Sequence, residues 1–208
     1  MELQFHGANC LTIATKQARI IVDDNLSELG AKSITKAGDI AIFTHEHNAP
    51  DQEVKLIIDE PGEYEVADIS IQGIAVRAHT DEEGEKTATL YKLLVDDVRI
   101  VITGHIYPEL TDAELEIIGV VDVLCIPVGG NGYTVDATGV LKLIKEIEPK
   151  LVIPTHYADK ILKYPVPQQS LEDALKNLAM EPKESVPKLR IKPADLSDVM
   201  QFVIVERS

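Results

Sequence analysis

Short aliphatic runs, each closed by polar or glycine-containing residues, most constrain the fold of this chain. Apolar runs of three to eight residues bounded by turn residues are typical of strands. Such runs fill the first half of the sequence, at residues 3–5, 10–14, 18–22, 40–44, 56–58, 69–76, 88–95 and 98–103. A chain that begins with so many strands must bury them in packed sheets.

After about residue 110, strands alternate with helical patterns. Thr111 and Glu114 have capping-box spacing, and Ser170 is a typical N-cap residue. The predicted helices lie at 111–118, 135–147 and 170–178, and the predicted strands at 120–128, 151–153, 189–191 and 201–205. This order predicts one domain over residues 1–208 of the mixed α/β (α+β) class, in which sheet packs on sheet and helices cover the outer faces.

Composition narrows the function classes. The formal net charge of −15 disfavours non-specific binding to nucleic acid, although a locally positive site would still accept an RNA end or a phosphorylated small molecule. Cys10 and Cys125 each lie in an apolar run, where a free cysteine is a small core residue. No run approaches the length of a membrane span, and the N-terminus lacks a signal-peptide pattern. We therefore expect a cytoplasmic protein that does not bind membranes.

Two histidines one residue apart follow the apolar run at 40–43. Residues two apart in an extended chain point to the same side, so His45 and His47 would present two imidazoles to one point beyond the strand. Imidazole suits zinc, iron, manganese and nickel. The alternative is a pair of surface residues in a loop, and this pair alone does not decide between the two.

The position of the other histidines favours a shared site. All six follow strand-like runs, and none lies in a predicted helix: His6, His45, His47, His79, His105 and His156. Strand ends of one sheet system can lie side by side, so these side chains can converge. A catalytic zinc takes three protein ligands and lowers the pKa of its bound water toward about 7. The alternative is that each imidazole only bonds a loop carbonyl.

The order of these motifs resembles the metallo-β-lactamase fold superfamily, and within it the small bacterial hydrolases related to the ascorbate-phosphate lactonases. The resemblance covers roughly residues 3–160. It rests on His45-Glu46-His47, His79, Gly104-His105, Pro154-Thr155-His156-Tyr157, and the segments 60–66, 126–130 and 133–136. It implies a four-layer αββα sandwich with a metal centre at one edge of the sheets, and hydrolysis by a metal-bound hydroxide.

Residue by residue, the resemblance implies that His45, His47 and His79 hold the first metal ion. It implies that His156 belongs to a second ion and that Asp23 hydrogen-bonds the metal loop behind it. His105 stands where the family has a bridging aspartate.

The chain also departs from the family's HxHxDH pattern, so that motif is degenerate here. The motif's aspartate and third histidine fall on Ala49 and Pro50. A neutral imidazole at His105 cannot link two cations as a carboxylate does. We therefore expect one ion, zinc or another divalent metal such as manganese or iron, with His105 and His156 assisting or holding a weak second ion. Asp51 is the nearest replacement for the missing acid and is the candidate catalytic residue, although Pro50 fixes the chain before it.

Two functions from different classes remain open. The leading hypothesis is a metal-dependent hydrolase that attacks an ester-, amide- or phosphodiester-like bond of a small-molecule substrate with a metal-bound hydroxide. The alternative is a degenerate, non-catalytic family member that binds a ligand or partner, which the residues at 49, 50 and 105 favour. A purely structural domain would leave the placement of the histidines unexplained.

Overall fold

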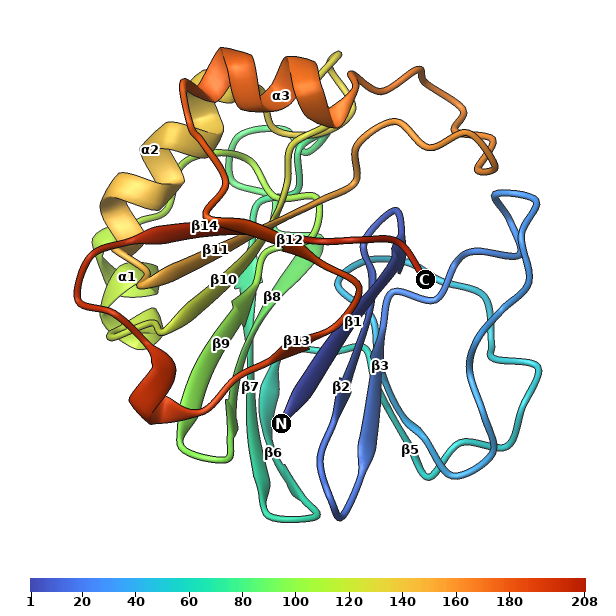
Figure 1. Cartoon of the computed structure of the whole chain (residues 1–208). Coiled ribbons are helices and arrows are strands. Elements are labelled where there is room, and N and C mark those ends of the chain that lie inside the picture. The colour runs from blue at the N-terminus through green and yellow to red at the C-terminus, as the bar shows by residue number, and fades with distance from the viewer.

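The computed structural model describes residues 1–208 and consists of two β-sheets packed face to face (Figure 1). The first sheet has the strand order β13-β1-β2-β3-β4-β5. Its strands are β1 (Glu2–Gly7), β2 (Cys10–Ala14), β3 (Arg19–Val22), β4 (Ile40–Ile42), β5 (Leu56–Ile58) and β13 (Leu189–Arg190). Strands β1 to β3 are antiparallel, whereas β3, β4 and β5 run parallel.

The second sheet is larger and has the order β12-β14-β11-β10-β9-β8-β7-β6. Its strands are β6 (Gly62–Val66), β7 (Ile69–Val76), β8 (Ala88–Val95), β9 (Val98–Ile102), β10 (Val123–Pro127), β11 (Leu151–Thr155), β12 (Glu184–Val186) and β14 (Gln201–Val205). Strands β9, β10, β11 and β14 are parallel, and β6 to β9 form an antiparallel meander. This half carries the helices α1 (Asp112–Ile118), α2 (Ala137–Ile147) and α3 (Leu171–Leu178), and a 3₁₀ turn spans Pro193–Asp195.

Aliphatic side chains hold the sandwich together. Between the sheets, residues such as Leu11, Ile20, Tyr91 and Ile100 are fully buried in one apolar cluster that extends from β1 to β14. A second cluster joins the outer face of the larger sheet to the three helices. Because burial of such side chains is the main favourable contribution to folding, these two layers fix the positions of the strand ends.

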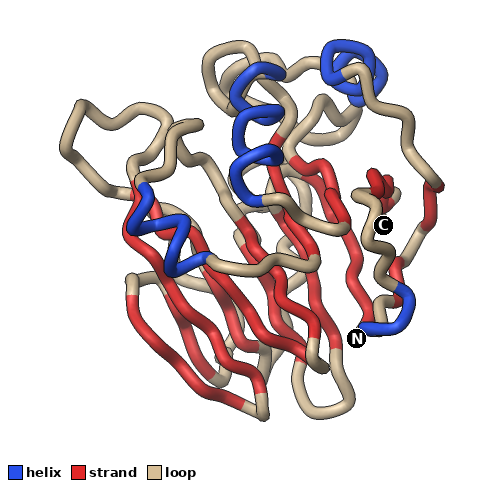
Figure 2. Tube along the Cα trace, turned by 90° about the vertical axis from the view of Figure 1, so that its left-hand side faces the viewer, coloured by secondary structure: helices blue, strands red, loops and turns tan.

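The outer face of the first sheet is covered differently from the outer face of the second. Loop residues such as Leu26, Leu29 and Leu162 pack there against Ile21 and Phe43, and no helix lies on this face (Figures 1 and 2). The mixed α/β class and the sheet-on-sheet packing are confirmed. The outer layer expected to be helical over the first sheet consists of loops, whose Leu26, Leu29 and Leu162 supply the apolar contacts with that face.

Most predicted elements are found at the expected places. Strands β2, β5, β7, β8 and β14 have the predicted bounds, and the capping box of Thr111 and Glu114 is formed in both directions. Strand β6 was missed, because its exposed Glu63 and Glu65 alternate with half-buried residues and so resemble a polar turn. Such alternation is typical of a solvated edge strand. The short edge strand β12 was missed as well.

The parallel strands bring distant segments to one edge of the sandwich. Strands β9 and β11 flank β10 in parallel, so the residues that follow them meet at the same edge. Strand β7 runs in the same direction as β9, since each is antiparallel to β8. The loop after β4 in the other sheet reaches this edge too, as Thr44 accepts a backbone hydrogen bond from Thr89 at the start of β8. No helix in the structure is long and apolar enough to cross a membrane.

Candidate functional site

Three imidazoles from three strand ends meet at this edge. The ring centre of His105, after β9, lies 5.3 Å from that of His45, after β4, and 4.6 Å from that of His156, after β11. Both pairs are edge-to-face, with interplanar angles of 84° and 80°. We call these three residues the histidine cluster. Their convergence from distant parts of the chain is what the positions of the strand ends predicted.

The loop that carries His45 is anchored from beneath by Asp23. The backbone N–H and the hydroxyl of Thr44 each donate a hydrogen bond of 2.7 Å to the Asp23 carboxylate. Asp23 is buried, and burial raises the pKa of its carboxyl group above the usual value. The Thr44 hydroxyl also lies 3.2 Å from Nδ1 of His45. Asp23 therefore performs the loop-holding role expected of it, and the loop in turn orients the imidazole of His45.

His156 is held in place by the turn between β1 and β2. Its backbone N–H donates to the carbonyl of Ala8 at 2.7 Å, and its own φ is +50°. The preceding Thr155 donates its hydroxyl to Asn9 of the same turn. A positive φ is uncommon outside glycine, so these contacts hold His156 in a conformation that it would not adopt alone.

Tyr133 joins the cluster as an aromatic neighbour that the sequence reasoning did not place there. Its ring centre is 5.1 Å from that of His105 and 5.7 Å from that of His156. The tyrosine follows a tight turn in which Gly130, Asn131 and Gly132 all have positive φ. The two glycines therefore serve the turn, because they adopt a positive φ without strain. The one feature of the sequence that could have placed Tyr133 at the site is its position in the loop after the apolar strand β10.

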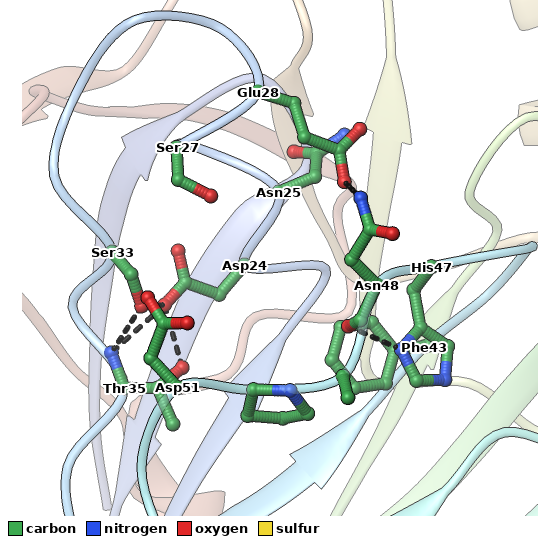
Figure 3. Close-up of a pocket in the computed structure, with 12 residues that line it drawn as sticks. Asp24, Asn25, Ser27, Glu28, Ser33, Thr35, Phe43, His47, Asn48 and Asp51 are labelled. Carbon is green, nitrogen blue, oxygen red and sulfur yellow. Dashed lines mark hydrogen bonds between the residues drawn. The ribbon is translucent and has the colours of Figure 1, made fainter.

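His79 and His47 lie at the margins of the cluster. Nε2 of His79 is 2.9 Å from the carbonyl oxygen of Gly132, and its backbone N–H donates to His105. His47 stacks on Phe43, with ring centres 3.6 Å apart (Figure 3). Both of its ring nitrogens have protein partners, the carbonyl of Asn48 and the carboxylate of Asp59. The structure therefore brings His105 and His156 to His45, while the ring of His47 is engaged elsewhere.

Burial keeps the central imidazoles neutral. Removal from water lowers the pKa of His105 well below its usual value, and the adjacent His156 lowers it further. Burial likewise lowers the pKa of His156 to about 4. Nδ1 of His79, His105 and His156 is buried and has no hydrogen-bond partner. Buried polar atoms are normally bonded, so three unbonded nitrogens in one region call for an explanation.

The donor chemistry of the cluster fits a divalent metal ion. Neutral imidazoles with free lone pairs are ligands for zinc and for its neighbours in the first transition row. Two imidazoles on one tetrahedral zinc have ring centres about 5 Å apart, close to the spacings observed here. As the side chains stand, however, no group of three or more His, Cys, Asp or Glu residues is arranged to hold an ion. The cluster thus has suitable donors at suitable spacing, and its rings must rotate to enclose an ion.

Three open cavities meet at the cluster and share His45 and Glu46. The Glu60 lobe has a volume of about 480 Å³ and also contains Asp59, Glu60 and Lys86. The Lys163 lobe, of about 510 Å³, contains Glu28, His47, Tyr133 and Lys163. The His79 lobe, of about 370 Å³, contains His79, His105 and Tyr133. A small molecule could therefore reach His45 from any of the three lobes.

Asp51, the candidate catalytic residue, lines a different cavity. That cavity has a volume of about 80 Å³ and also contains Asp24, Ser33 and His47, but neither His45 nor His105 (Figure 3). His6 is likewise outside the cluster. Its two ring nitrogens lie 3.0 Å from the Thr12 hydroxyl and 2.6 Å from the Ser208 hydroxyl, so His6 is held by the protein away from the cluster.

A two-sheet sandwich with histidines gathered at the strand ends defines the class of the metallo-β-lactamase fold. The family model described as a β-lactamase superfamily domain matches residues 2–156, and the chain therefore belongs to that superfamily. A search of the curated proteins found no match.

Solved structures share this fold at low sequence identity. A candidate Zn-dependent hydrolase of the metallo-β-lactamase superfamily from Thermotoga maritima is 22% identical, with 99% of each chain covered and a TM-score of 0.76. The metallo hydrolase Igni18 from Ignicoccus hospitalis is 16% identical, with 99% of this chain and 94% of that chain covered and a TM-score of 0.62. CmlA, a diiron β-hydroxylase from Streptomyces venezuelae, is 9% identical, with 86% and 49% covered and a TM-score of 0.55. These similarities extend to the fold alone.

Proposed function

We propose that this protein is a metal-dependent hydrolase whose single divalent ion is held by the histidine cluster. One observation carries the proposal: the imidazoles of His45 and His156, from two other strand ends, lie within 5.3 Å of the His105 ring, and His105 and His156 are neutral and have unbonded nitrogens. Membership of a superfamily with zinc and diiron neighbours supports it. Zinc, manganese and iron all suit imidazole ligands.

Each residue of the site would have its own role in this hydrolysis. A bound divalent ion supplies Lewis-acid polarisation of the scissile bond and activates water near neutral pH. His105 and His156 offer neutral lone pairs because burial disfavours their protonation. Thr44 and Asp23 fix the direction of His45, and the ring of Tyr133 packs against the rings of His105 and His156. The reacting bond would be ester-, amide- or phosphodiester-like, in a small molecule that enters through one of the lobes.

The residues at the second-ion positions support the proposal of a single ion. His105 replaces a bridging carboxylate, and Ala49 and Pro50 offer no donor side chain. Carboxylates offset the mutual repulsion of two cations, and three neutral imidazoles provide no such offset. One ion with a ligand set of histidines is therefore the arrangement that this donor chemistry favours.

The test is elemental analysis of protein purified without a histidine tag, combined with hydrolysis assays. We expect close to one equivalent of metal per chain, and activity on esters, lactams or phosphodiesters that is lost on chelation and regained on adding metal back. Metal-free protein that takes up no zinc, manganese or iron would contradict the proposal.

The second candidate is a non-catalytic family member that binds a ligand or partner. The observation that favours it is that no three side chains are arranged to hold an ion as they stand, with His47 stacked on Phe43. Stoichiometric metal without turnover on any of the three bond types would support this function over hydrolysis.

A further inference from the structure

The three lobes around the histidine cluster have an uneven distribution of charge. Glu46 lines all three of them, and its exposed carboxylate has neither a hydrogen-bond nor an ion-pair partner. In the Glu60 lobe it is joined by the carboxylates of Asp59 and Glu60. No arginine lines any of the lobes.

The positive side chains near the cluster offset little of this charge. Lys86, in the Glu60 lobe, lies 2.7 Å from a carboxylate oxygen of Glu114 and is therefore paired outside the lobe. Lys163 lines a different lobe. The Glu60 lobe is thus a negatively charged cavity that opens beside His45, whose side chain is half-buried.

We propose that the substrate of this site carries a positively charged group, an ammonium or a guanidinium, which occupies the Glu60 lobe beside Glu46 and Glu60 while the reacting bond lies at the histidine cluster. This inference rests on the proposed function. The unbonded buried nitrogens of the cluster mark where the reacting end would lie, and the carboxylates mark where the charge would lie. An anionic substrate would meet carboxylates on entry and would be disfavoured.

The test uses three p-nitrophenyl esters of similar size. One carries a trimethylammoniobutanoyl group, the second its neutral tert-butyl isostere, and the third a hemiglutarate with a negative charge. We expect kcat/KM to fall in that order, by about tenfold between the cationic and neutral esters, because the carboxylates of the lobe attract the cationic group and repel the anionic one. Raising the salt concentration to about 0.5 M should reduce the difference. A neutral or anionic ester used best would overturn the proposal.

Variants then locate the charge preference. Glu46→Gln and Glu60→Gln should each lower the ratio of kcat/KM for the cationic ester to that for the neutral ester by about threefold to tenfold. Glu65→Gln removes the same charge at the exposed far end of β6, outside all three lobes, and should leave that ratio unchanged. An equal ratio in all three variants and the wild type would contradict a role for the Glu60 lobe.

A binding measurement separates this proposal from the proposed function. The amides of the same cationic and neutral acyl groups are titrated into the full-length protein while the histidine proton resonances are recorded. If none of the esters is hydrolysed, ester hydrolysis is refuted, yet tighter binding of the cationic amide, weakened by Glu46→Gln, would still support the charge preference. Equal binding of both amides would refute it, whatever the esters show.

Discussion

A Cβ built on Gly104 would overlap both the hydroxyl oxygen and the Cβ of Thr44, because the two residues lie in direct contact across the sandwich. Gly104 precedes His105 and has a φ of +61°, and Thr44 precedes His45. This contact therefore sets the separation of the two loops that bring His45 and His105 together. Only glycine allows so close an approach with this backbone conformation.

Gly104→Ala should push the two loops apart. We expect a loss of about 2–4 kcal/mol in the free energy of unfolding, from overpacking and a strained φ, together with weaker metal binding. Gly38→Ala is the matched control, because Gly38 has a φ of +84° but nothing within 4 Å of its added Cβ. Urea denaturation and metal titration of both variants measure the difference. Equal effects in the two variants would mean that strain alone, and no contact with Thr44, matters at Gly104.

Thr44→Val should leave the buried carboxylate of Asp23 without one of its two donors from this loop. Losing a hydrogen bond to a buried acceptor costs about 1–3 kcal/mol, and the valine keeps the shape of threonine. Ser185→Ala removes an exposed hydroxyl that donates to Glu206 at 2.9 Å, and should cost less than about 0.5 kcal/mol. Thermal denaturation of both variants compares the two losses. A Thr44→Val protein as stable as the wild type would argue against the anchoring role of Asp23.

The two histidines His105 and His47 should differ in their contribution to metal binding. His105→Phe keeps an aromatic ring between Tyr133 and His156 but removes the donor nitrogens, and should weaken zinc binding by more than about 100-fold. His47→Asn should weaken it by less than about tenfold, because the ring of His47 is engaged by Phe43, Asn48 and Asp59. Competition with a fluorescent chelator gives both affinities. If His47→Asn weakened zinc binding more than His105→Phe did, His47 and the other ligands implied by the family would form the main metal site.

His6 should make stability depend on pH between about 4 and 6.5. Burial lowers the pKa of His6 from 6.5 to about 4, so the unfolded chain binds its proton more readily than the folded protein does. The free energy of unfolding is therefore unaffected by protonation of His6 above about pH 6.5. It decreases as the pH falls toward 4, by up to about 3 kcal/mol. Urea denaturation of wild type and His6→Gln across this range isolates the effect. Parallel curves for the two proteins would show that His6 does not titrate in this way.

The sequence predicted the framework of the site but not the orientation of its side chains. Placing His105 and His156 beside His45 needed only the rule that each follows a strand, because the burial of β9 and β11 fixes where those strands end. The shared direction of His45 and His47 was inferred from an extended chain. The backbone bends at Thr44 and His45, so the two-residue alternation is lost and the ring of His47 packs on Phe43.

Other features depend on contacts that no local pattern reveals. Tyr133 reaches the cluster because the turn at Gly130–Gly132 directs it there. The glycines in the sequence indicate a turn, but not the direction in which the next side chain leaves it. The loops over the first sheet were visible as polar segments. The sequence did not show that these loops take the place of a helical layer. This is seen only in the structure, where Leu26, Leu29 and Leu162 pack on the outer face of the first sheet.

The most direct test of the account is a zinc-soaked crystal measured at the zinc absorption edge. We predict one strong anomalous peak, about 2 Å from ring nitrogens of at least two of His45, His105 and His156. Two fully occupied peaks about 3.5–4 Å apart would contradict the single-ion centre. A peak bound by His47 and His79 without His105 would contradict the histidine cluster as the ligand set.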